Sequence, residues 1–493
     1  MQYLLGVDVG TTGTKTILFR EDGKIMGQSY CAYPTQNPQV GYSEQNPEDW
    51  WNSVCQTVRE VSADPEVRSN IVAISMSTQG GTMVGLDKDG KPVRPAMVWS
   101  DKRCQEELEE FRSHQKALDV YRICGWNVSA AAPMLQCCWL QKHEIDNFSR
   151  IHRFLSVPDY LAWRMTGMEA IDISNAGVCR FTDIQKGDYS QELLAYSGLR
   201  AEQLPRILPS AEPIGKLTAE AAEALHLTQN VLLVSGAHDQ YAVALGAGAC
   251  NNGDILIGSG TSWVVMSIAD EPDFESGLPQ SVTAVPGKWG SLWSLSTGGV
   301  CLEWWRKKLT ADADGTLLPF DVINEEVAKK KAAEDGLFFY PFTGRATNAD
   351  RFQKASFVGL DLSHDRFHLA RAIMEGVAFQ IVWTMRLFRA KPSKEGIKLA
   401  GGASKSKLWC QMVADIANLP VRIPETADLA CVGAAIMAGV GCGLYPDAQS
   451  GYDKLAVADR VILPDPERAE VYKKLYSQYQ EFAACLGDMY DKR

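Results

Sequence analysis

The chain has 493 residues, of which 46% are hydrophobic and 22% are charged, which is typical of a globular protein with more than one core. Its 60 acidic and 49 basic residues give a formal charge of −11, which argues against nucleic acid or an anionic membrane as the main partner. No segment is long and apolar enough to span a bilayer, and residues 1–10 lack a signal-peptide pattern, so we expect a cytoplasmic protein.

The 13 cysteines show no metal-ligand spacing and no Cys-x-x-Cys pair. In a chain of this length and composition, we expect reduced thiols that are buried as small apolar residues, and no disulfide framework.

The first thirty residues predict strands joined by tight turns. An apolar strand over Tyr3–Val9 leads into a turn at residues 10–13, and a β-branched strand follows over Thr16–Phe19. Residues 21–23 then form a hairpin turn into a third strand. The sequence therefore begins with an antiparallel meander.

A helix follows with clear start signals. Asn46 is its expected N-cap, Pro47 its first residue, and two acidic residues lie in its first turn. Short apolar runs at 71–76 and 231–235 predict two further buried strands.

A second strand–turn–strand pattern lies at residues 254–268. Its triplet at residues 260–262, Gly-Thr-Ser, matches Gly-Thr-Thr at residues 10–12, an offset of 250 positions. This repeat indicates an internal duplication. We therefore expect two related domains, over residues 1–245 and 246–493.

Three helices are expected in the second half of the chain. They cover residues 365–388, a segment that begins at Ser404, and residues 431–443, where alanine and glycine are frequent.

The first turn is a candidate phosphate site. Asp8 ends the first strand, the turn exposes backbone amides, and hydroxyls and a cation follow at Thr11, Thr12, Thr14 and Lys15. Asp8 could hold Mg²⁺ or its waters, and a plain hairpin turn capped by Asp8 is the alternative. The matching turn at Gly260 and Thr261 favours the phosphate interpretation, because two such turns could hold one triphosphate.

Asp239 is the candidate catalytic base. It follows an apolar strand, where side chains point into the ligand crevice of α/β proteins, and its carboxylate could accept the proton of an attacking hydroxyl. An ordinary helix N-cap is the alternative, and position alone favours it. His238 is interpreted as a packing residue.

The stretch Gly401-Gly402-Ala403-Ser404 precedes a predicted helix. Its glycines would let an adenine ring approach the backbone, and an ordinary strand-to-helix turn is the alternative.

The order of these motifs resembles the FGGY family of carbohydrate kinases over nearly the whole chain. The segments that carry the resemblance are GVDVGTTGTK, YSEQNPEDWW, PAMVWSDKRC, GAHDQ, GSGTS, FVGLDLSHDRFHLARAIMEGVAF and LAGGASKSKLWCQMVADIANLPV. The resemblance implies an α/β protein of two ribonuclease-H-like, actin-like ATPase domains, with ATP, Mg²⁺ and a sugar or polyol in the cleft between them.

The resemblance also implies residue roles. Asp239 would be the base and Asp8 the Mg²⁺-side carboxylate. The implied nucleotide contacts are Thr11, Thr12, Thr14, Lys15, Gly260, Thr261, Gly401, Gly402, Ala403 and Ser404. The implied substrate contacts are Gln79, Gly80, Trp99, Asp101, Asp239 and Gln240.

Two departures leave the substrate open. Gln79 matches the family, but Gly80 and Gly81 replace the Met-His of xylulose kinases and the Arg-Glu of glycerol kinases, which we expect to leave room for a bulkier sugar. Arg345 and Ala346 stand where most members have a Glu and an Arg.

We expect transfer of the ATP γ-phosphate to a hydroxyl of a ketose such as xylulose, a polyol or a sugar acid. An actin- or Hsp70-like nucleotide switch and a degenerate ATP-binding homologue are the alternatives. A homodimer is one open expectation for the oligomeric state, and neither nucleic acid nor membrane is expected as a partner.

Overall fold

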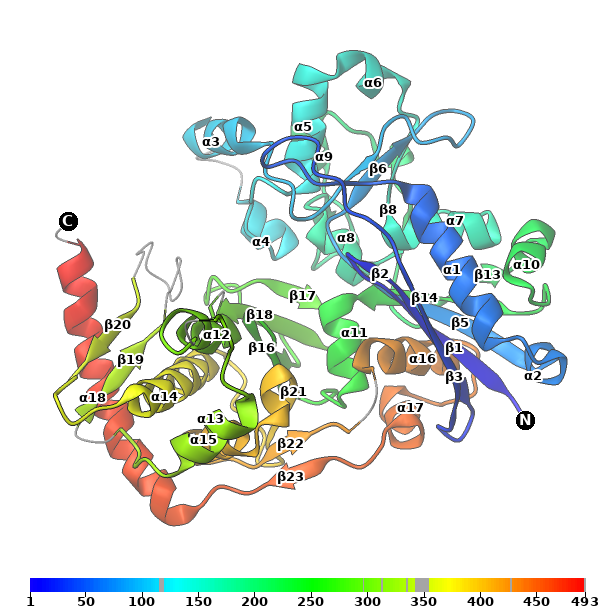
Figure 1. Ribbon diagram of the computed structural model, residues 1–493. Coiled ribbons are helices and arrows are strands. Elements are labelled where there is room, and N and C mark those ends of the chain that lie inside the picture. Colours follow the sequence, from blue (N-terminus) through cyan, green and yellow to red (C-terminus); the bar gives the residue numbers. More distant parts are fainter. Residues whose placement is uncertain are drawn as a thin grey trace.

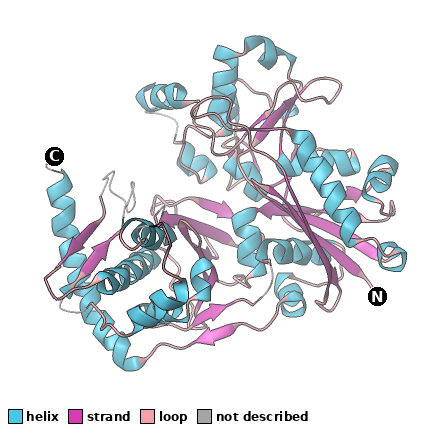
Figure 2. Ribbon diagram, viewed as in Figure 1, coloured by secondary structure: helices cyan, strands magenta, loops and turns pink. Residues whose placement is uncertain are grey.

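The computed structural model describes residues 1–114, 119–295, 297–311, 314–333, 336–341, 354–425 and 428–491. Two large mixed sheets form its framework, and helices cover both of them (Figures 1 and 2). Arg345 and Ala346 lie outside the described residues.

The first sheet has six strands in the order β13-β14-β5-β1-β2-β3. Their bounds are β1 (Tyr3–Val9), β2 (Gly13–Arg20), β3 (Ile25–Ala32), β5 (Ile71–Thr78), β13 (Pro213–Lys216) and β14 (Leu232–His238). Strands β1, β2 and β3 are antiparallel neighbours, whereas β5 is parallel to both β1 and β14.

The second sheet has seven strands in the order β17-β18-β16-β15-β21-β22-β23. Their bounds are β15 (Ile255–Ser259), β16 (Trp263–Ala269), β17 (Gln280–Val282), β18 (Trp289–Leu295), β21 (Ile397–Gly401), β22 (Val421–Ile423) and β23 (Arg460–Ile462). Strands β15, β16 and β18 are antiparallel neighbours, and β15, β21 and β22 are parallel.

The two sheets share one topology. Each contains three neighbouring antiparallel strands and, after them in the chain, two parallel ones, and the strand that joins the two sets is the first of its sheet along the chain. The repeated turn predicted this duplication, and the family resemblance implied its ribonuclease-H-like arrangement. The expected fold class is confirmed.

Smaller strands and helices surround this framework. A four-stranded sheet contains β4 (Glu44–Gln45), β7 (Ala96–Met97), β6 (Met83–Leu86) and β8 (Arg153–Ser156), and the paired short strands are β9 (Ala170–Asp172) with β12 (Arg206–Leu208), β10 (Thr182–Asp183) with β11 (Asp188–Tyr189), and β19 (Phe338–Tyr340) with β20 (Ser356–Val358). The helices are α1 (Pro47–Val61), α2 (Pro65–Ser69), α3 (Gln105–His114), α4 (Val120–Cys124), α5 (Pro133–His143), α6 (Ile145–Arg150), α7 (Val157–Thr166), α8 (Ile173–Val178), α9 (Gln191–Ser197), α10 (Ala219–Leu225), α11 (Asp239–Gly246), α12 (Gly299–Lys308), α13 (Phe320–Ala328), α14 (Arg366–Met385), α15 (Lys407–Ala417), α16 (Leu429–Gly441), α17 (Ala448–Leu455) and α18 (Pro466–Asp491).

Strand β1 shows how the sequence places these layers. Leu5, Val7 and Val9 belong to the core shared with α1, whereas Leu4 belongs to the core shared with α16. Successive side chains of a strand point to opposite faces, so an apolar run such as β1 fits a sheet that is covered on both sides.

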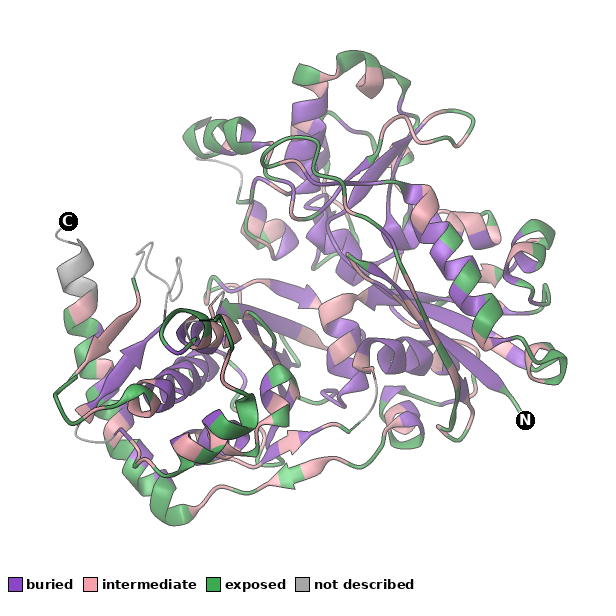
Figure 3. Ribbon diagram, in the orientation of Figure 1, coloured by how far each residue is buried: buried purple, intermediate pink, exposed green. Residues whose placement is uncertain are grey.

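Helices α11 and α16 lie between the two sheets, and each packs against the sheet formed by the other half of the chain (Figure 1). Helix α16, from the second half, packs on the first sheet, where a Cβ on Gly6 would lie 2.0 Å from the Cys431 carbonyl oxygen. Helix α11 follows the first sheet, yet its Tyr241 packs against Gly290 of β18 in the second sheet. One continuous core therefore joins the halves, and α16 is buried along most of its length (Figure 3).

Most of the expected elements are confirmed, and one helix start is wrong. Asn46 caps α1 by accepting a hydrogen bond from the Glu48 amide at 3.3 Å. The helix expected at Ser404 instead begins at Lys407, because the Ser406 hydroxyl accepts from the Trp409 amide and caps it. A short 3₁₀ turn over Gly402–Lys405 takes the earlier place.

All 13 cysteines are free thiols, most of them buried, as expected. Within the described residues, no helix is both long and apolar enough to cross a membrane.

Candidate active site

A cleft of about 480 Å³ lies between the two halves, where β14 meets α11. Its lining from the first half is Thr11, Gln79, Gly80, Gly81, Trp99, Trp126, Ser129, Ala131, Val178, Arg180, His238, Asp239 and Gln240. Its lining from the second half is Ser262, Val264, Pro279, Leu292, Trp293 and Ser294. The cleft thus brings together both Gly-Thr turns, through Thr11 and Ser262, and the candidate base.

Asp239 reaches the cleft as the first residue of α11. The cap position belongs to His238, and no side chain supplies a capping bond there, so the N-cap alternative for Asp239 is wrong. Its side chain is 37% exposed although Oδ1 is buried; Oδ1 lies 3.4 Å from His238 Nε2 and forms no hydrogen bond to any described residue, so the carboxylate is exposed to the cleft through its other atoms. The carboxylate is therefore available to accept a proton from a bound hydroxyl.

Asp8 is the next-to-last residue of β1, is partly buried, and lies close enough to Asp239 for their charges to interact. Burial raises the pKa of Asp8 to about 7, although the Ser77 hydroxyl donates to its Oδ1 at 2.7 Å and opposes the effect. The negative charges of Asp428 and Asp239 raise it further. A cation beside Asp8 would reverse this balance and favour the ionised carboxylate.

The first turn offers fewer phosphate contacts than expected. Thr11 borders the cleft and Thr12 is exposed, so both hydroxyls are accessible. Thr14 is fully buried and its Oγ1 lies 2.7 Å from Ser53 Oγ on α1, so a phosphate contact for Thr14 is wrong. Lys15 forms a 3.0 Å ion pair with Asp428 at the start of α16.

The second turn is one residue shorter than the first. Ser259 pairs with Trp263 across it, whereas Val9 pairs with Thr14 across the first turn. Gly260 and Thr261 are exposed at its tip, as a ligand contact requires.

The Gly401–Ser404 stretch lies beside this second turn. Gly401 pairs with Ser259 in the sheet, and the Ser259 hydroxyl accepts a hydrogen bond from the Ala403 amide at 3.1 Å. Gly401 has φ = +96°, and a Cβ there would lie 2.7 Å from the Ser259 carbonyl oxygen. Glycine is therefore required at this position. Ala403 is buried, and Ser404 uses its hydroxyl to bond the Gly401 carbonyl.

Two side chains of the first half that line the cleft, Gln79 and Trp99, hold the first turn in place. Gln79 is buried and donates to the Gly10 carbonyl at 3.3 Å. Trp99 is 51% exposed and its indole Nε1 donates to Thr11 Oγ1 at 2.9 Å. An indole ring that is exposed at a cleft can stack on a sugar. Gln240, next to the candidate base, also borders the cleft.

Comparison with known proteins agrees with this arrangement. Residues 3–246 match the N-terminal domain, and residues 255–442 the C-terminal domain, of the FGGY family of carbohydrate kinases. The chain belongs to the FGGY family of carbohydrate kinases.

Relatives in this family match over the full length. The chain is 28% identical to the xylulose kinase of Bacillus subtilis, covering 99% of this chain and 98% of that one, and 27% identical to the gluconokinase of the same organism, covering 99% and 97%. The crystal structure of a xylulose kinase from Rhodospirillum rubrum aligns with a TM-score of 0.92 at 26% identity, covering 99% of this chain and 100% of that one. The chain is accordingly a carbohydrate kinase, for which ATP is the phosphoryl donor.

Asp101 does not reach the cleft, so a direct substrate contact for this residue is wrong. Its side chain is fully buried, accepts from the Ser43 amide at 2.6 Å and forms a 2.7 Å ion pair with Arg103. Arg103 in turn lies over the Tyr42 ring. The FGGY segment Trp-x-Asp-x-Arg therefore uses its charges to hold the loop that presents Trp99.

The expected extra room at Gly80 is also wrong. A Cβ on Gly80 would lie 2.2 Å from His238 Cδ2 and 3.3 Å from Asn175 Oδ1. The imidazole of His238 therefore fills the space beside Gly80. Gly81 has φ = +70°, a conformation that glycine adopts without strain.

Sequence reasoning missed several lining residues. The sequence predicts a packing role for His238 and indicates no site role for Arg180 or Trp293. The sequence could have identified Arg180 as a candidate site residue, because it is a lone cation in the apolar run Gly-Val-Cys-Arg-Phe. Trp293 had none, because burial of a tryptophan in a strand is the ordinary expectation.

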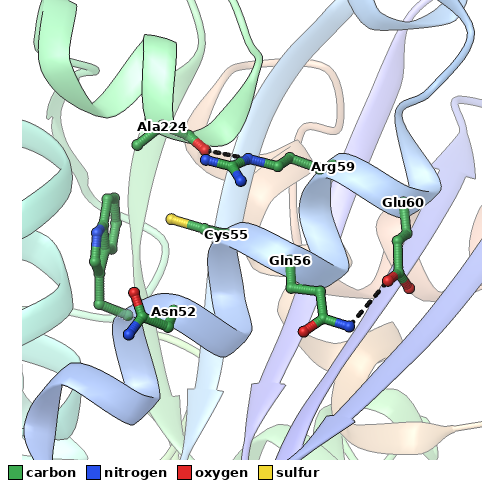
Figure 4. Close-up of a pocket in the computed structure, with 7 residues that line it drawn as sticks. Asn52, Cys55, Gln56, Arg59, Glu60 and Ala224 are labelled. Carbon is green, nitrogen blue, oxygen red and sulfur yellow. Dashed lines mark hydrogen bonds between the residues drawn. The ribbon is translucent and has the colours of Figure 1, made fainter.

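A second hollow, of about 490 Å³, lies on the outer side of α1 next to α10 (Figure 4). Arg59 closes one end of it by donating to the Ala224 carbonyl at 2.6 Å, and Gln56 donates to Glu60 at 3.0 Å. None of the expected site residues lines it.

Proposed function

We propose that this kinase transfers the γ-phosphate of ATP to a sugar hydroxyl, and that Asp239 is the general base. The observation that carries the proposal is the state of the Asp239 carboxylate, which lines the cleft without capping α11 or accepting a hydrogen bond from any residue that the structure describes. A positioned carboxylate can remove the hydroxyl proton as the oxygen attacks phosphorus.

The two exposed turns are proposed to hold the triphosphate. Thr11 and Thr12 would contact it from the first half, and Gly260 and Thr261 from the second. Because the halves approach the cleft from opposite sides, their closure would exclude the water that could otherwise be phosphorylated in place of the sugar. The Gly401–Ser404 stretch would border the adenosine.

The donor set at Asp8 fits Mg²⁺. Its Oδ2 accepts no hydrogen bond from any described residue, while Ser77 orients Oδ1. A carboxylate oxygen together with phosphate oxygens and water is the environment that Mg²⁺ prefers, and the bound ion would neutralise phosphate charge. Lys15 would act from a distance, because Asp428 already pairs with it.

The names of the relatives leave the sugar open. They include xylulose kinases, a gluconokinase and an L-xylulose/3-keto-L-gulonate kinase, so neutral and acidic sugars both occur among them. A cytoplasmic location, where ATP is supplied, belongs to the same proposal.

The test is ADP release against a panel of ketoses, polyols and sugar acids. Asp239→Asn should lower kcat by roughly 10²–10⁴-fold, because general-base catalysis contributes about that factor. Binding of ATP should survive in this variant. Asp89→Asn is the matched control, since Asp89 is an exposed turn residue whose carboxylate pairs with the neighbouring Lys88.

Two results would count against the proposal. Sugar-stimulated turnover that persists in Asp239→Asn would remove the base assignment. Binding of ATP without stimulation by any sugar would favour a non-catalytic homologue instead.

A further inference from the structure

Arg180 is a buried cation in the wall of the cleft. Its side chain lies just beyond α8, the residue is 8% exposed, and the guanidinium donates to the carbonyl oxygens of Val178 and, at 3.0 Å, Asn127. No carboxylate of the described residues forms an ion pair with it. Burial lowers the pKa of Arg180, which reflects the cost of a charge without a counter-charge. A guanidinium in this state is compensated when a ligand supplies the anion.

The neighbours of Arg180 also offer unused hydrogen-bonding nitrogens. The Arg180 guanidinium lies 5.4 Å from the Trp126 ring centroid, and the Trp126 and His238 rings are 6.1 Å apart. Arg180 Nε, Trp126 Nε1 and His238 Nδ1 are all buried without a hydrogen-bond partner. Buried polar groups are normally paired, so these three neighbouring nitrogens are free to bind an acceptor on a ligand once their side chains shift enough to expose them.

The backbone at Arg180 supports a role for the side chain. Its φ is +62°, a left-handed conformation that is uncommon for residues other than glycine, asparagine and aspartate. The apolar neighbours Cys179 and Phe181 are buried in the core on either side. An arginine at a strained position in an apolar stretch is poorly explained by stability, and strained residues are concentrated at ligand sites.

Successive contacts connect Arg180 to the candidate base. Trp126 neighbours both Arg180 and His238, and His238 Nε2 lies 3.4 Å from Asp239 Oδ1. The cationic Arg180 and the anionic Asp239 therefore both line the same cleft. An anionic group on a substrate would be attracted to Arg180 and repelled from Asp239.

We propose that Arg180 binds a carboxylate of the substrate, so that this kinase phosphorylates a sugar acid in preference to a neutral ketose or polyol. The proposal rests on the phosphotransfer function proposed above. A carboxylate on Arg180 places the rest of the carbon chain toward Asp239. The phosphorylated hydroxyl is then remote from the carboxylate.

The test compares matched substrates that differ in the carboxylate. Gluconate is paired with glucitol and xylonate with xylitol, and fructose and xylulose serve as ketoses. The wild-type enzyme should have a kcat/KM at least about 100-fold higher for an acid than for its polyol, because a site built for a polar group discriminates strongly against a substrate that lacks it.

Variants of Arg180 separate recognition from folding. Arg180→Met should lower kcat/KM for the acid about 100-fold more than for a neutral sugar, and Arg180→Lys should recover part of that loss, because it restores the charge without the planar fork. The KM for ATP should change less than threefold in both. If Arg180→Met does not fold, wild-type thermal shifts by gluconate and glucitol give the same comparison, and the acid should give the larger shift.

The outcomes are distinct for the two proposals. Preference of the wild type for a ketose or polyol, or an equal loss on acids and neutral sugars in Arg180→Met, would overturn the assignment of Arg180. Absence of ADP release with every sugar would instead overturn the phosphotransfer function. Phosphorylation of the acid at the carbon next to the carboxylate would contradict the proposed orientation.

Discussion

Replacement of Gly80 by alanine should disturb the site through His238. The added Cβ would lie 2.2 Å from His238 Cδ2 and 2.8 Å from Nε2, and contacts under 3.0 Å are not tolerated. To reach the 3.4 Å of an ordinary contact, the ring must move by about 1.2 Å. The Trp126 and Tyr241 rings, with centroids 6.1 and 5.8 Å from that of His238, oppose this movement.

The magnitude follows from the overlap. Overpacking of a well-filled region costs about 1–3 kcal/mol, which lowers Tm by roughly 2–12 °C in a protein with domains of this size. His238 directly precedes Asp239, and a 1 Å displacement of a catalytic group lowers the rate by about 100-fold. We therefore expect kcat to fall by that order in Gly80→Ala.

A double-mutant cycle with His238→Ala isolates the cause. Thermal unfolding and steady-state ADP release are measured for the wild type, both single variants and the double variant. Without the imidazole, the Gly80→Ala substitution should cost less than about 0.5 kcal/mol, because the next nearest atom, Asn175 Oδ1, lies 3.3 Å from the added Cβ. Gly258→Ala is the control, since its Cβ would meet only the Val264 carbonyl oxygen at 3.9 Å.

An equal penalty for Gly80→Ala with and without the imidazole would refute the reasoning. It would show that the penalty does not come from contact with His238. A normal kcat in Gly80→Ala with a lowered Tm would refute the link to Asp239 alone.

Two further substitutions test the nucleotide turns. Trp99→Phe removes the indole donor that holds Thr11 Oγ1 at 2.9 Å, and should raise KM for ATP several-fold, since a lost hydrogen bond costs about 0.5–1.5 kcal/mol. Steady-state kinetics at saturating sugar measure this change, and an unchanged KM for ATP would contradict the role of Thr11. Gly401→Ala adds a Cβ 2.7 Å from the Ser259 carbonyl oxygen at φ = +96°. Distortion of the turn, which costs about 1–3 kcal/mol, should weaken ATP binding about tenfold. Calorimetric titration measures this affinity, and tight ATP binding by a destabilised variant would place the adenosine elsewhere.

The duplicated fold was predictable because each copy of the repeated turn lies in a short strand–turn–strand pattern that can be read from neighbouring residues. Each Gly-Thr turn stands between an apolar strand and a β-branched strand, and that pattern indicates the hairpin in both halves. The topology then follows from the family resemblance.

Part of the site could be predicted from local sequence combined with the family resemblance. An apolar strand before Asp239 predicts a side chain in the ligand crevice, and Asp239 lines the cleft because β14 ends beside it. The environment of Gly80 depends on His238, which is distant in sequence, and Asp101 is withdrawn by its pairing with Arg103. Such long-range contacts leave no local pattern, so the sequence predicts empty space beside Gly80 where the structure has the His238 imidazole.

The exchange of α11 and α16 between the sheets constrains how the two halves of the sequence can change. A Cβ on Gly433 would lie 2.0 Å from the Ala242 carbonyl oxygen, and one on Gly246 would lie 1.9 Å from that of Leu429. A side chain gained by either helix would have to be accommodated by the other. The halves of the duplication therefore cannot diverge independently at this crossing, and small residues there preserve the geometry by which Asp239 faces the cleft.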